Sequence, residues 1–244
     1  SRSSTCRSEC SASRPVTKWM RVGAADIAER LAGTGTLIYH GGPMILEGLV
    51  TTAAADGRPH VAAMGPGVDD DERAAGRIGT LLLRPFPTSQ TATNLLRSRA
   101  GVFHLCDDVL LLARVVAGEA GEPAVRPATV VPGGFVLTDA CRAYEFEIVS
   151  VDDSAERLRL EARVVMEHEQ RQFTGFNRAA HAVVEAAILV TRLHLLDEQE
   201  IRRRLTELAV LVEKTGGRRE REAFELLAAR EPRNTKAESL GKGV

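Results

Sequence analysis

The stretch Arg84–Leu96, RPFPTSQTATNLL, is polar and lies between two apolar runs. The run before it, IGTLLL (residues 78–83), predicts a strand, and the run after it, GVFHLC (residues 101–106), predicts another. Pro85 and Pro87 end the first strand, because proline cannot donate to a strand ladder. The arginine, the hydroxyl residues and the asparagine of the stretch therefore stand at the start of a predicted helix.

A helix start of this composition has two interpretations. The N-terminus of a helix exposes unpaired N–H groups and the positive end of the macrodipole, so hydroxyls and an arginine there favour a phosphate site. Alternatively, Thr88 or Ser89 merely caps the helix and the other polar side chains face water. One cap needs one hydroxyl, whereas the turn supplies Thr88, Ser89, Thr91 and Thr93. The chemistry of the turn alone leaves the two interpretations balanced.

Short strands are expected between residues 44 and 165. Asp56–Pro59 (DGRP) marks one hairpin turn and residues 152–156 (DDSAE) mark another. Residues 68–77 (VDDDERAAGR) are too polar to bury and are expected to form a loop. Many short strands at this spacing predict an antiparallel barrel or sandwich. The predicted strands are 44–54, 60–66, 78–83, 101–106, 133–151 and 157–165.

The segment around residue 145 shows the strand period most clearly. Its apolar residues Tyr144, Phe146 and Ile148 alternate with Glu145 and Glu147. This alternation is typical of a half-buried strand with a polar outer face.

The hydrophobic period changes to that of a helix after Phe173. The second of three helical segments begins with acidic residues and ends with Lys214 before two glycines, as a capped amphipathic helix does. Residues 107–118 are expected to form a further short helix capped by Asp107. The sequence thus predicts an α+β chain, a β-barrel followed by a helical hairpin or bundle. The three helical segments are 175–196, 197–217 and 219–231.

Four segments carry the motifs MILEGLVTT…HVAAMGP, LRPFPTSQTATNLL…GVFHLCDDVLLLAR, TDACRAYEFEIV and GFNRAAHAVVEAAILVTRLHLL…VEKTGGRREREAFELL. In this order they resemble a family of uncharacterised proteins with an FMN-binding split-barrel fold. Members of that family occur in methanogenic archaea and in bacteria that carry tetrahydromethanopterin-linked one-carbon genes. The similarity runs from Met44 to about Glu231. We expect a split-barrel domain over 44–172, a helical region over 173–231 and a flexible tail over 232–244.

Residues 1–43 have no counterpart in the family. They are rich in Ser and Arg, as transit segments are, although Glu9 is acidic. No apolar core follows them, so they do not form a secretory signal. We expect a disordered extension that adds nothing to the fold or to binding.

The resemblance implies a bound flavin mononucleotide (FMN) at the interface of a homodimer. Its phosphate would lie on the turn at the helix start, where an arginine can bond two phosphate oxygens at once. Its ring would lie against the first hairpin, where Gly65 permits a close approach of backbone and Met64 offers a polarisable face. Alternatively, Thr51 and Met64 are barrel side chains without ligand contact. The implied residues are Arg84, Ser89, Thr91, Thr93 and Asn94 for the phosphate, and Thr51, Thr52, Met64 and Gly65 for the ring.

Catalytic motifs are absent from the sequence, which has no GxSxG, HExxH or Walker loop and no GxGxxG after a strand. Asn177, His181 and Glu185 share one face of a predicted helix, with Arg178 beside them. We expect a buried polar network there. One alternative is a substrate site formed by Asn177, Arg178 and His181 at the flavin edge. The other is a metal site with two ligands, which are too few without a third. His104 is given no role, and His194 is expected to be structural.

The composition excludes several classes of protein. Hydrophobic residues make up 44% and charged residues 27%, and the formal net charge of -1 indicates neither a nucleic-acid partner nor an anionic membrane. No apolar run approaches the ~20 residues of a membrane helix. Cys106 and Cys141 lie in apolar runs and are expected to be free thiols, while Cys6 and Cys10 have no partner pair. This usage fits a reducing, cytoplasmic compartment.

Two functions remain. In the first, the protein is a flavin-dependent oxidoreductase that passes a hydride to or from a small molecule. In the second, it is a non-catalytic module that binds a flavin or a pterin-like ligand. Split barrels host both, so the fold does not decide between them.

Overall fold

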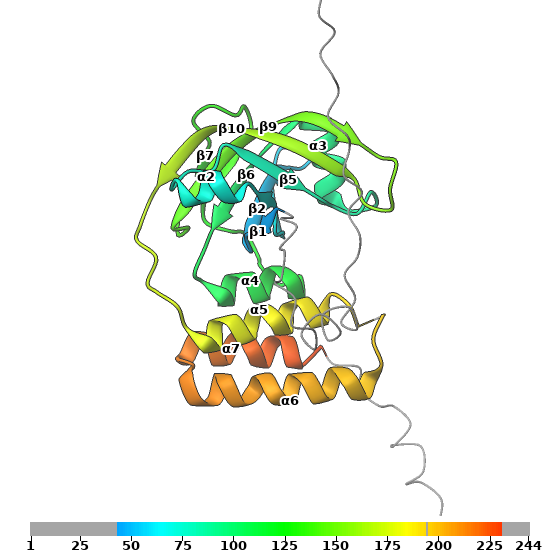
Figure 1. Ribbon diagram of the computed structural model, residues 1–244, viewed down its shortest axis with the longest axis vertical. Coiled ribbons are helices and arrows are strands. Elements are labelled where there is room, and N and C mark those ends of the chain that lie inside the picture. Colours follow the sequence, from blue (N-terminus) through cyan, green and yellow to red (C-terminus); the bar gives the residue numbers. More distant parts are fainter. Residues whose placement is uncertain (1–42, 194, 231–244) are drawn as a thin grey trace, which may run out of the picture. The chain divides into compact units, whose positions relative to one another are not determined.

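The structure is a computed structural model that describes residues 43–193 and 195–230. The predictions for residues 1–42, for His194 and for the tail from residue 231 lie outside the described residues. The strands are β1 (Met44–Ile45), β2 (Leu49–Ala53), β3 (Pro59–Ala63), β4 (Gly67–Val68), β5 (Thr80–Leu83), β6 (Ala100–Leu105), β7 (Val125–Pro127), β8 (Phe135–Leu137), β9 (Arg142–Asp152) and β10 (Arg159–Glu169). The helices are α2 (Asp70–Ala74), α3 (Gln90–Ser98), α4 (Val109–Ala117), α5 (Arg178–Val190), α6 (Glu198–Thr215) and α7 (Arg218–Ala228) (Figure 1).

Eight strands form one antiparallel sheet in the order β1-β4-β5-β10-β9-β6-β2-β3. The register between β9 and β10 shifts between Glu161 and Ala162 and again between Val164 and Met166. Such irregularities bend a strand and increase its twist, which lets the sheet curl around a core (Figure 1). The predicted α+β fold, a split barrel with C-terminal helices, is confirmed.

The inner face of the curled sheet holds the barrel core. Its largest side chains are fully buried, and α3 adds Ala92 and Leu95 to the same cluster. The helix therefore closes the barrel and is fixed to it by apolar packing. The core side chains of the sheet include Leu83, Phe103, Tyr144, Phe146 and Leu160.

The other face of the central strands is also buried, contrary to the expectation from the alternation at residues 144–148. Thr51 on β2, His104 on β6 and Glu145 on β9 are all 0% exposed. They are buried because the β7–β8 hairpin, which the sequence did not predict as a separate sheet, lies over them. Of the two glutamates in the pattern, only Glu147 is exposed.

The buried polar groups bind the backbone of that hairpin. The Glu145 carboxylate accepts hydrogen bonds from the backbone N–H groups of residues 129, 130 and 131, at 2.5, 2.7 and 2.7 Å. His168 Nε2 lies 2.7 Å from the same carboxylate. Thr51 Oγ1 donates to the Phe135 carbonyl. The N–H groups of residues 129–131 and the carbonyl of Phe135 in the hairpin therefore all have hydrogen-bond partners in the sheet.

His104 joins the hairpin to the sheet through both ring nitrogens. Its Nε2 accepts from the Leu137 N–H at 3.0 Å, and its Nδ1 lies 3.2 Å from the Leu49 carbonyl. This pattern requires the neutral ring with the proton on Nδ1. Burial lowers the pKa of His104 to about 3.

Helix α4 lies within the predicted split-barrel segment but packs with the C-terminal helices. Its apolar side chains Val109, Leu110 and Ala113 join the cluster formed by α5, α6 and α7. Its N-cap is Asp108, whose carboxylate accepts from the N–H groups of residues 110 and 111. The prediction that Asp107 caps this helix is wrong.

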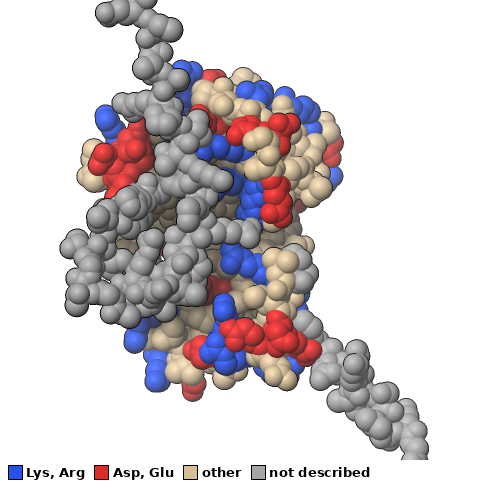
Figure 2. Space-filling view, turned by 45° about the vertical axis from the view of Figure 1, so that its right-hand side comes forward, with Lys and Arg blue, Asp and Glu red and all other residues tan. Residues whose placement is uncertain are grey.

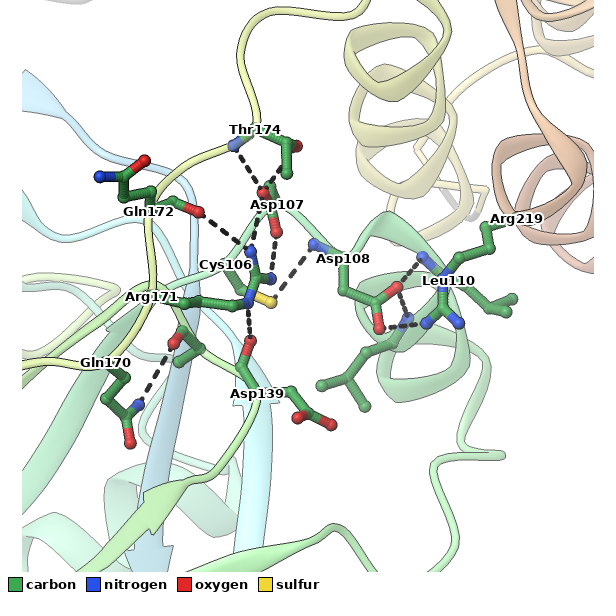
Figure 3. Close-up of polar contacts among 12 residues, drawn as sticks. Cys106, Asp107, Asp108, Leu110, Asp139, Gln170, Arg171, Gln172, Thr174 and Arg219 are labelled. Atoms are coloured by element: carbon green, nitrogen blue, oxygen red, sulfur yellow. Dashed lines mark hydrogen bonds and ion pairs between the residues drawn. The ribbon is translucent and has the colours of Figure 1, made fainter.

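Asp107 instead holds the segment that leads from the barrel to α5 (Figure 3). Its carboxylate accepts from the Arg171 guanidinium, and from the backbone N–H and hydroxyl of Thr174 at 3.0 and 2.8 Å. Arg171 is the main cause that holds the pKa of Asp107 well below its usual range. Asp108, one residue on, pairs with Arg219 of α7. The adjacent carboxylates of Asp107 and Asp108 therefore hold two different segments: the one that leads into α5, and α7.

Two local predictions near the N-terminal end of the barrel are wrong. The predicted strand 44–54 is two strands separated by residues 46–48; at Gly48 the backbone passes so close to β6 that a Cβ would lie 2.4 Å from the His104 carbonyl oxygen. The predicted loop 68–77 contains the end of β4 and the short helix α2, which Asp69 caps. Cys106 and Cys141 are free thiols, as predicted.

Candidate functional site

Helix α3 begins after β5 and the two prolines that follow that strand, Pro85 and Pro87. Ser89 is the N-cap: its hydroxyl accepts from the Ala92 N–H at 3.1 Å and donates to the Phe86 carbonyl at 2.8 Å. The capping interpretation is therefore correct for Ser89. A cap of this kind stabilises a helix by about 1 kcal/mol.

Capping leaves two backbone donors of α3 unpaired. Within residues 43–193 and 195–230, the N–H groups of Gln90 and Thr91 have no hydrogen-bond partner. Arg84, six residues before Gln90 in the chain, is exposed and makes no ion pair with any described residue. Unpaired donors, the positive helix end and a free guanidinium together attract an anion.

Three other predicted phosphate residues bind protein groups. Thr91 is buried with its Oγ1 3.2 Å from His60 Nε2, and Thr93 Oγ1 donates to the Ser89 carbonyl at 3.3 Å. Asn94, 0% exposed, donates to Thr52 Oγ1 at 2.9 Å. Thr91 and Asn94 thus fix α3 to β3 and β2. Of the polar groups predicted to bind the phosphate, Arg84 is the side chain left without a partner among the described residues.

Two residues near the α3 start were not expected from the sequence. The Arg157 guanidinium lies 3.9 Å from the centre of the Phe86 ring, and the Leu158 N–H donates to the Pro85 carbonyl at 3.1 Å. The β9–β10 turn therefore brings a second cation to the turn. His60 on β3 is half-buried beside Thr91, and burial lowers its pKa. No local motif marks either residue, because both contacts join distant segments.

The predicted ring residues lie on two faces of the sheet. Thr51 and Thr52 are neighbours on one strand, so their side chains point to opposite sides. Thr51 faces the β7–β8 hairpin and Thr52 faces α3, as their hydrogen bonds show. Thr52 alone is therefore on the side of the α3 start.

Met64 and Gly65 follow β3, the edge strand of the sheet. Met64 packs against the barrel core. Gly65 is tightly packed, because a Cβ there would lie 2.6 Å from Ile45 Cγ2. From His60 to Met64 the chain advances four residues, or about 13 Å along a strand. The extended segment from His60 to Met64 thus leads from the start of α3 to the residues that follow the β2–β3 hairpin.

The α5 residues do not form the predicted buried network. Asn177 is the N-cap of α5, and its Oδ1 accepts from the Ala179 N–H at 2.7 Å. Arg178, His181 and Glu185 are exposed. In the described residues, no group of three or more His, Cys, Asp or Glu side chains is arranged to hold a metal ion.

Surface charge is mixed. On the face shown in Figure 2, acidic and basic side chains are interleaved over the described surface. In the part of the chain that the structure describes, no helix has the length and apolar character needed to cross a bilayer.

Comparisons with known proteins identify the chain's relatives. Models of two domains of one family match residues 46–171 and 177–229. A search of curated proteins found no match. The crystal structure of FMN-bound protein MM1853 from Methanosarcina mazei, assigned to the same family, is 20% identical with a TM-score of 0.61 and covers 78% of this chain and 96% of its own. It shares the fold.

Two further structures are similar over a smaller part of the chain. The FMN-binding protein from Thermus thermophilus with bound 1-cyclohex-2-enone is 17% identical (TM-score 0.43; 57% of this chain, 78% of that one). Flavoredoxin from Methanosarcina acetivorans is 10% identical (TM-score 0.44; 59% and 79%). The two family models together cover most of the sequence, from residue 46 to residue 229. The chain belongs to the family described as Protein of unknown function (DUF447).

Proposed function

We propose that the protein binds FMN, with the phosphate on the α3 start and the ring at the end of β3. The observation that carries the proposal is the pair of unpaired N–H groups of Gln90 and Thr91 at the start of α3, together with the exposed guanidinium of Arg84 six residues before Gln90. The Methanosarcina mazei relative, described as FMN-bound, has the same fold and belongs to the same family. The donor set fits a dianionic phosphate.

The path of the rest of the ligand follows from β3. As an edge strand, β3 has a row of backbone groups without a strand partner in the described residues. These groups supply both donors and acceptors, as the polar edge of an isoalloxazine ring requires. The about 13 Å between His60 and Met64 would hold the ribityl chain and part of the ring. Met64 then lies at the ring end of this path, and Thr52, opposite His60, lies at the phosphate end.

We propose that the bound flavin serves an oxidoreductase acting on a small molecule. The flavin supplies the hydride chemistry, while Arg84 and α3 anchor its phosphate and β3 orients its ring. A non-catalytic flavin- or pterin-binding module is the second candidate, because the sequence carries none of the catalytic motifs and the hydroxyls of Ser89, Thr91 and Thr93 bind protein groups. Anaerobic bleaching of the yellow protein by NADH, NADPH or a reduced pterin distinguishes the two. The reduced pterin tests the link to one-carbon metabolism.

Replacing Arg84 by alanine is expected to weaken FMN binding about ten- to a hundredfold. A charge-assisted contact contributes roughly 1.5–3 kcal/mol, and each ~1.4 kcal/mol is tenfold in affinity. Riboflavin lacks the phosphate, so its affinity is expected to stay the same. Fluorescence titrations with both ligands measure the difference.

Arg97→Ala is the matched control for Arg84→Ala. Arg97 lies in the last turn of the same helix and donates to the Ala53 carbonyl. Its loss is expected to change FMN and riboflavin binding equally, if at all. Equal weakening of the two ligands by Arg84→Ala would show that Arg84 is structural.

We also propose a homodimer, as the resemblance to the family implies. The apolar face of α5 is covered by α4, α6 and α7 and gives no support for a second subunit. Support comes instead from Phe173 and Phe176, an aromatic pair 5.8 Å apart whose members are 54% and 89% exposed. Light scattering is expected to give twice the chain mass, and Phe176→Ser to lower it. A monomer at tens of micromolar would contradict the proposal.

A further inference from the structure

Cys106 and Cys141 lie opposite each other at the end of the β6–β9 strand pair. The ladder pairs Leu105 with Arg142, so Cys106 and Cys141 are the next two residues in the same register. The Cys141 N–H donates to the Leu105 carbonyl at 2.8 Å, which keeps the two segments together beyond the last pair. Opposite residues of an antiparallel pair point their side chains to the same face. Because alternate residues of a strand share a face, this is the face of His104.

Two consecutive backbone N–H groups bring the sulfur atoms together. Cys106 Sγ accepts from the Asp108 N–H at 3.4 Å. Burial raises the pKa of Cys141, and the Asp107 N–H, which donates a hydrogen bond to its sulfur, lowers it. Consecutive residues are only about 3.8 Å apart along a chain. The register and the hydrogen bonds therefore agree that the two thiols are neighbours, and both are free.

The spacing suits a disulfide bond. The Cβ atoms of opposite residues on an antiparallel pair are about 4.5–5.5 Å apart, and a disulfide joins Cβ atoms about 3.5–4.5 Å apart. The bond thus needs a closure of about 1 Å. Cys106 and Cys141 both lie just outside the strands, next to the ends of β6 and β9, so a shift of this size leaves the ladder intact.

The pair lies where the barrel joins the helical region. Figure 3 shows Cys106 beside Asp107 and Arg171, which hold the segment that leads to α5. Asp108, the next residue, caps α4 and pairs with Arg219 of α7. The chain between the two cysteines carries α4 and the β7–β8 hairpin. A bond between the sulfur atoms closes this segment at its base.

We propose that Cys106 and Cys141 are an oxidisable dithiol whose disulfide fixes the junction between the barrel and the helices. The oxidant is of the hydroperoxide class. The Cys106 thiolate attacks one oxygen of hydrogen peroxide, the O–O bond breaks, and a sulfenic acid and one water form. The Cys141 thiol then displaces the hydroxyl from that sulfur, so that the disulfide and a second water form. Cys106 reacts first because it is partly exposed, whereas Cys141 is 4% exposed.

The surroundings of the pair make this oxidation slow at neutral pH. Only the thiolate attacks, and burial raises the pKa of Cys106 to about 11. The carboxylates of Asp108 and Asp107 and the Cys141 thiol add to this rise in pKa. Arg171 also faces the thiols, but it is paired with Asp107. The rate of bond formation is therefore expected to rise about tenfold for each pH unit between pH 7 and pH 9, as the thiolate fraction does.

The test treats the whole chain with hydrogen peroxide and analyses its peptides by mass spectrometry without reductant. A peptide pair joined through Cys106 and Cys141 is expected, and dithiothreitol is expected to separate it. The oxidised protein is expected to melt roughly 5–10 °C above the reduced protein. Reduced Cys106 and Cys141 after treatment, or cross-links confined to Cys6 and Cys10, would overturn the proposal. So would a cross-link that lowers the melting temperature, because it would form only in a distorted chain.

Single variants separate the two steps of the reaction. In Cys141→Ser, the sulfenic acid of Cys106 is expected to persist and to be trapped by dimedone. In Cys106→Ser, the buried Cys141 is expected to stay reduced; equal trapping in both variants would overturn the assigned order. The chain with Cys6→Ser and Cys10→Ser is the matched control, in which the cross-link is expected to form as in the wild type. If Cys141→Ser does not fold, Cys141→Ala gives the same comparison.

Discussion

Replacing Glu145 by alanine is expected to lower the free energy of unfolding by about 3–5 kcal/mol, the usual cost of removing one member of a buried ionic group. The carboxylate is 0% exposed and accepts three backbone N–H groups of the β7–β8 hairpin as well as the contact from His168. Burial raises the pKa of Glu145, but the backbone donors and His168 outweigh it and hold the pKa below its usual range. Alanine leaves these donors buried and unpaired.

Urea unfolding at pH 7 measures the change, and Glu147→Ala is the control. Glu147 is two residues further along β9, is exposed and forms a surface pair with Arg163 at 3.5 Å. Its loss is expected to change stability by at most about 0.5 kcal/mol. A similar small effect of Glu145→Ala would show that the hairpin does not depend on this carboxylate.

Lowering the pH from 7 to 4 is expected to remove about 3 kcal/mol of stability through His104 alone. The unfolded chain protonates this histidine below pH 6.5, whereas the folded protein does so only below about pH 3. The unfolded state therefore binds more protons throughout this window, and stability falls as the pH falls. Above pH 6.5 the contribution is fully retained.

Glutamine at position 104 separates this effect from the other titrating groups. Its amide can donate to the Leu49 carbonyl and accept from the Leu137 N–H, but it does not titrate. The loss of stability between pH 7 and pH 4 is expected to be about 3 kcal/mol smaller in His104→Gln than in the wild type. His60→Gln, at a half-buried site, is the control and is expected to change the loss by less. Identical losses in wild type and His104→Gln would contradict the assignment.

Periodicity predicted the barrel and the helices because both signals are local. Alternation at residues 144–148 gave β9, and the turn residues at 56–59 gave the β2–β3 hairpin. Alternation could not show that the polar face of β9 is covered. The covering hairpin is short and lies up to 20 residues before Glu145 in the chain, so its contact with Glu145 is set by tertiary packing.

The candidate site was predictable in part. The polar turn correctly marked a helix start with a capping serine, since cap and turn chemistry are written in neighbouring residues. The directions in which the side chains of Thr91 and Asn94 point were not predictable, because they depend on where β2 and β3 pass the helix. Arg157 reaches the α3 start from the β9–β10 turn. Single-sequence patterns do not record such contacts.

The membership of α4 in the helical cluster has a consequence for synthesis on the ribosome. About 60 residues separate Ala117 at the end of α4 from Arg178 at the start of α5. At about 5–20 residues per second, α4 emerges roughly 3–12 seconds before its first helical partner. During that interval its apolar residues Val109, Leu110 and Ala113 lack the cover that α5 and α7 later provide. The nascent chain thus presents a chaperone-accessible segment until α5 and α7 have been translated.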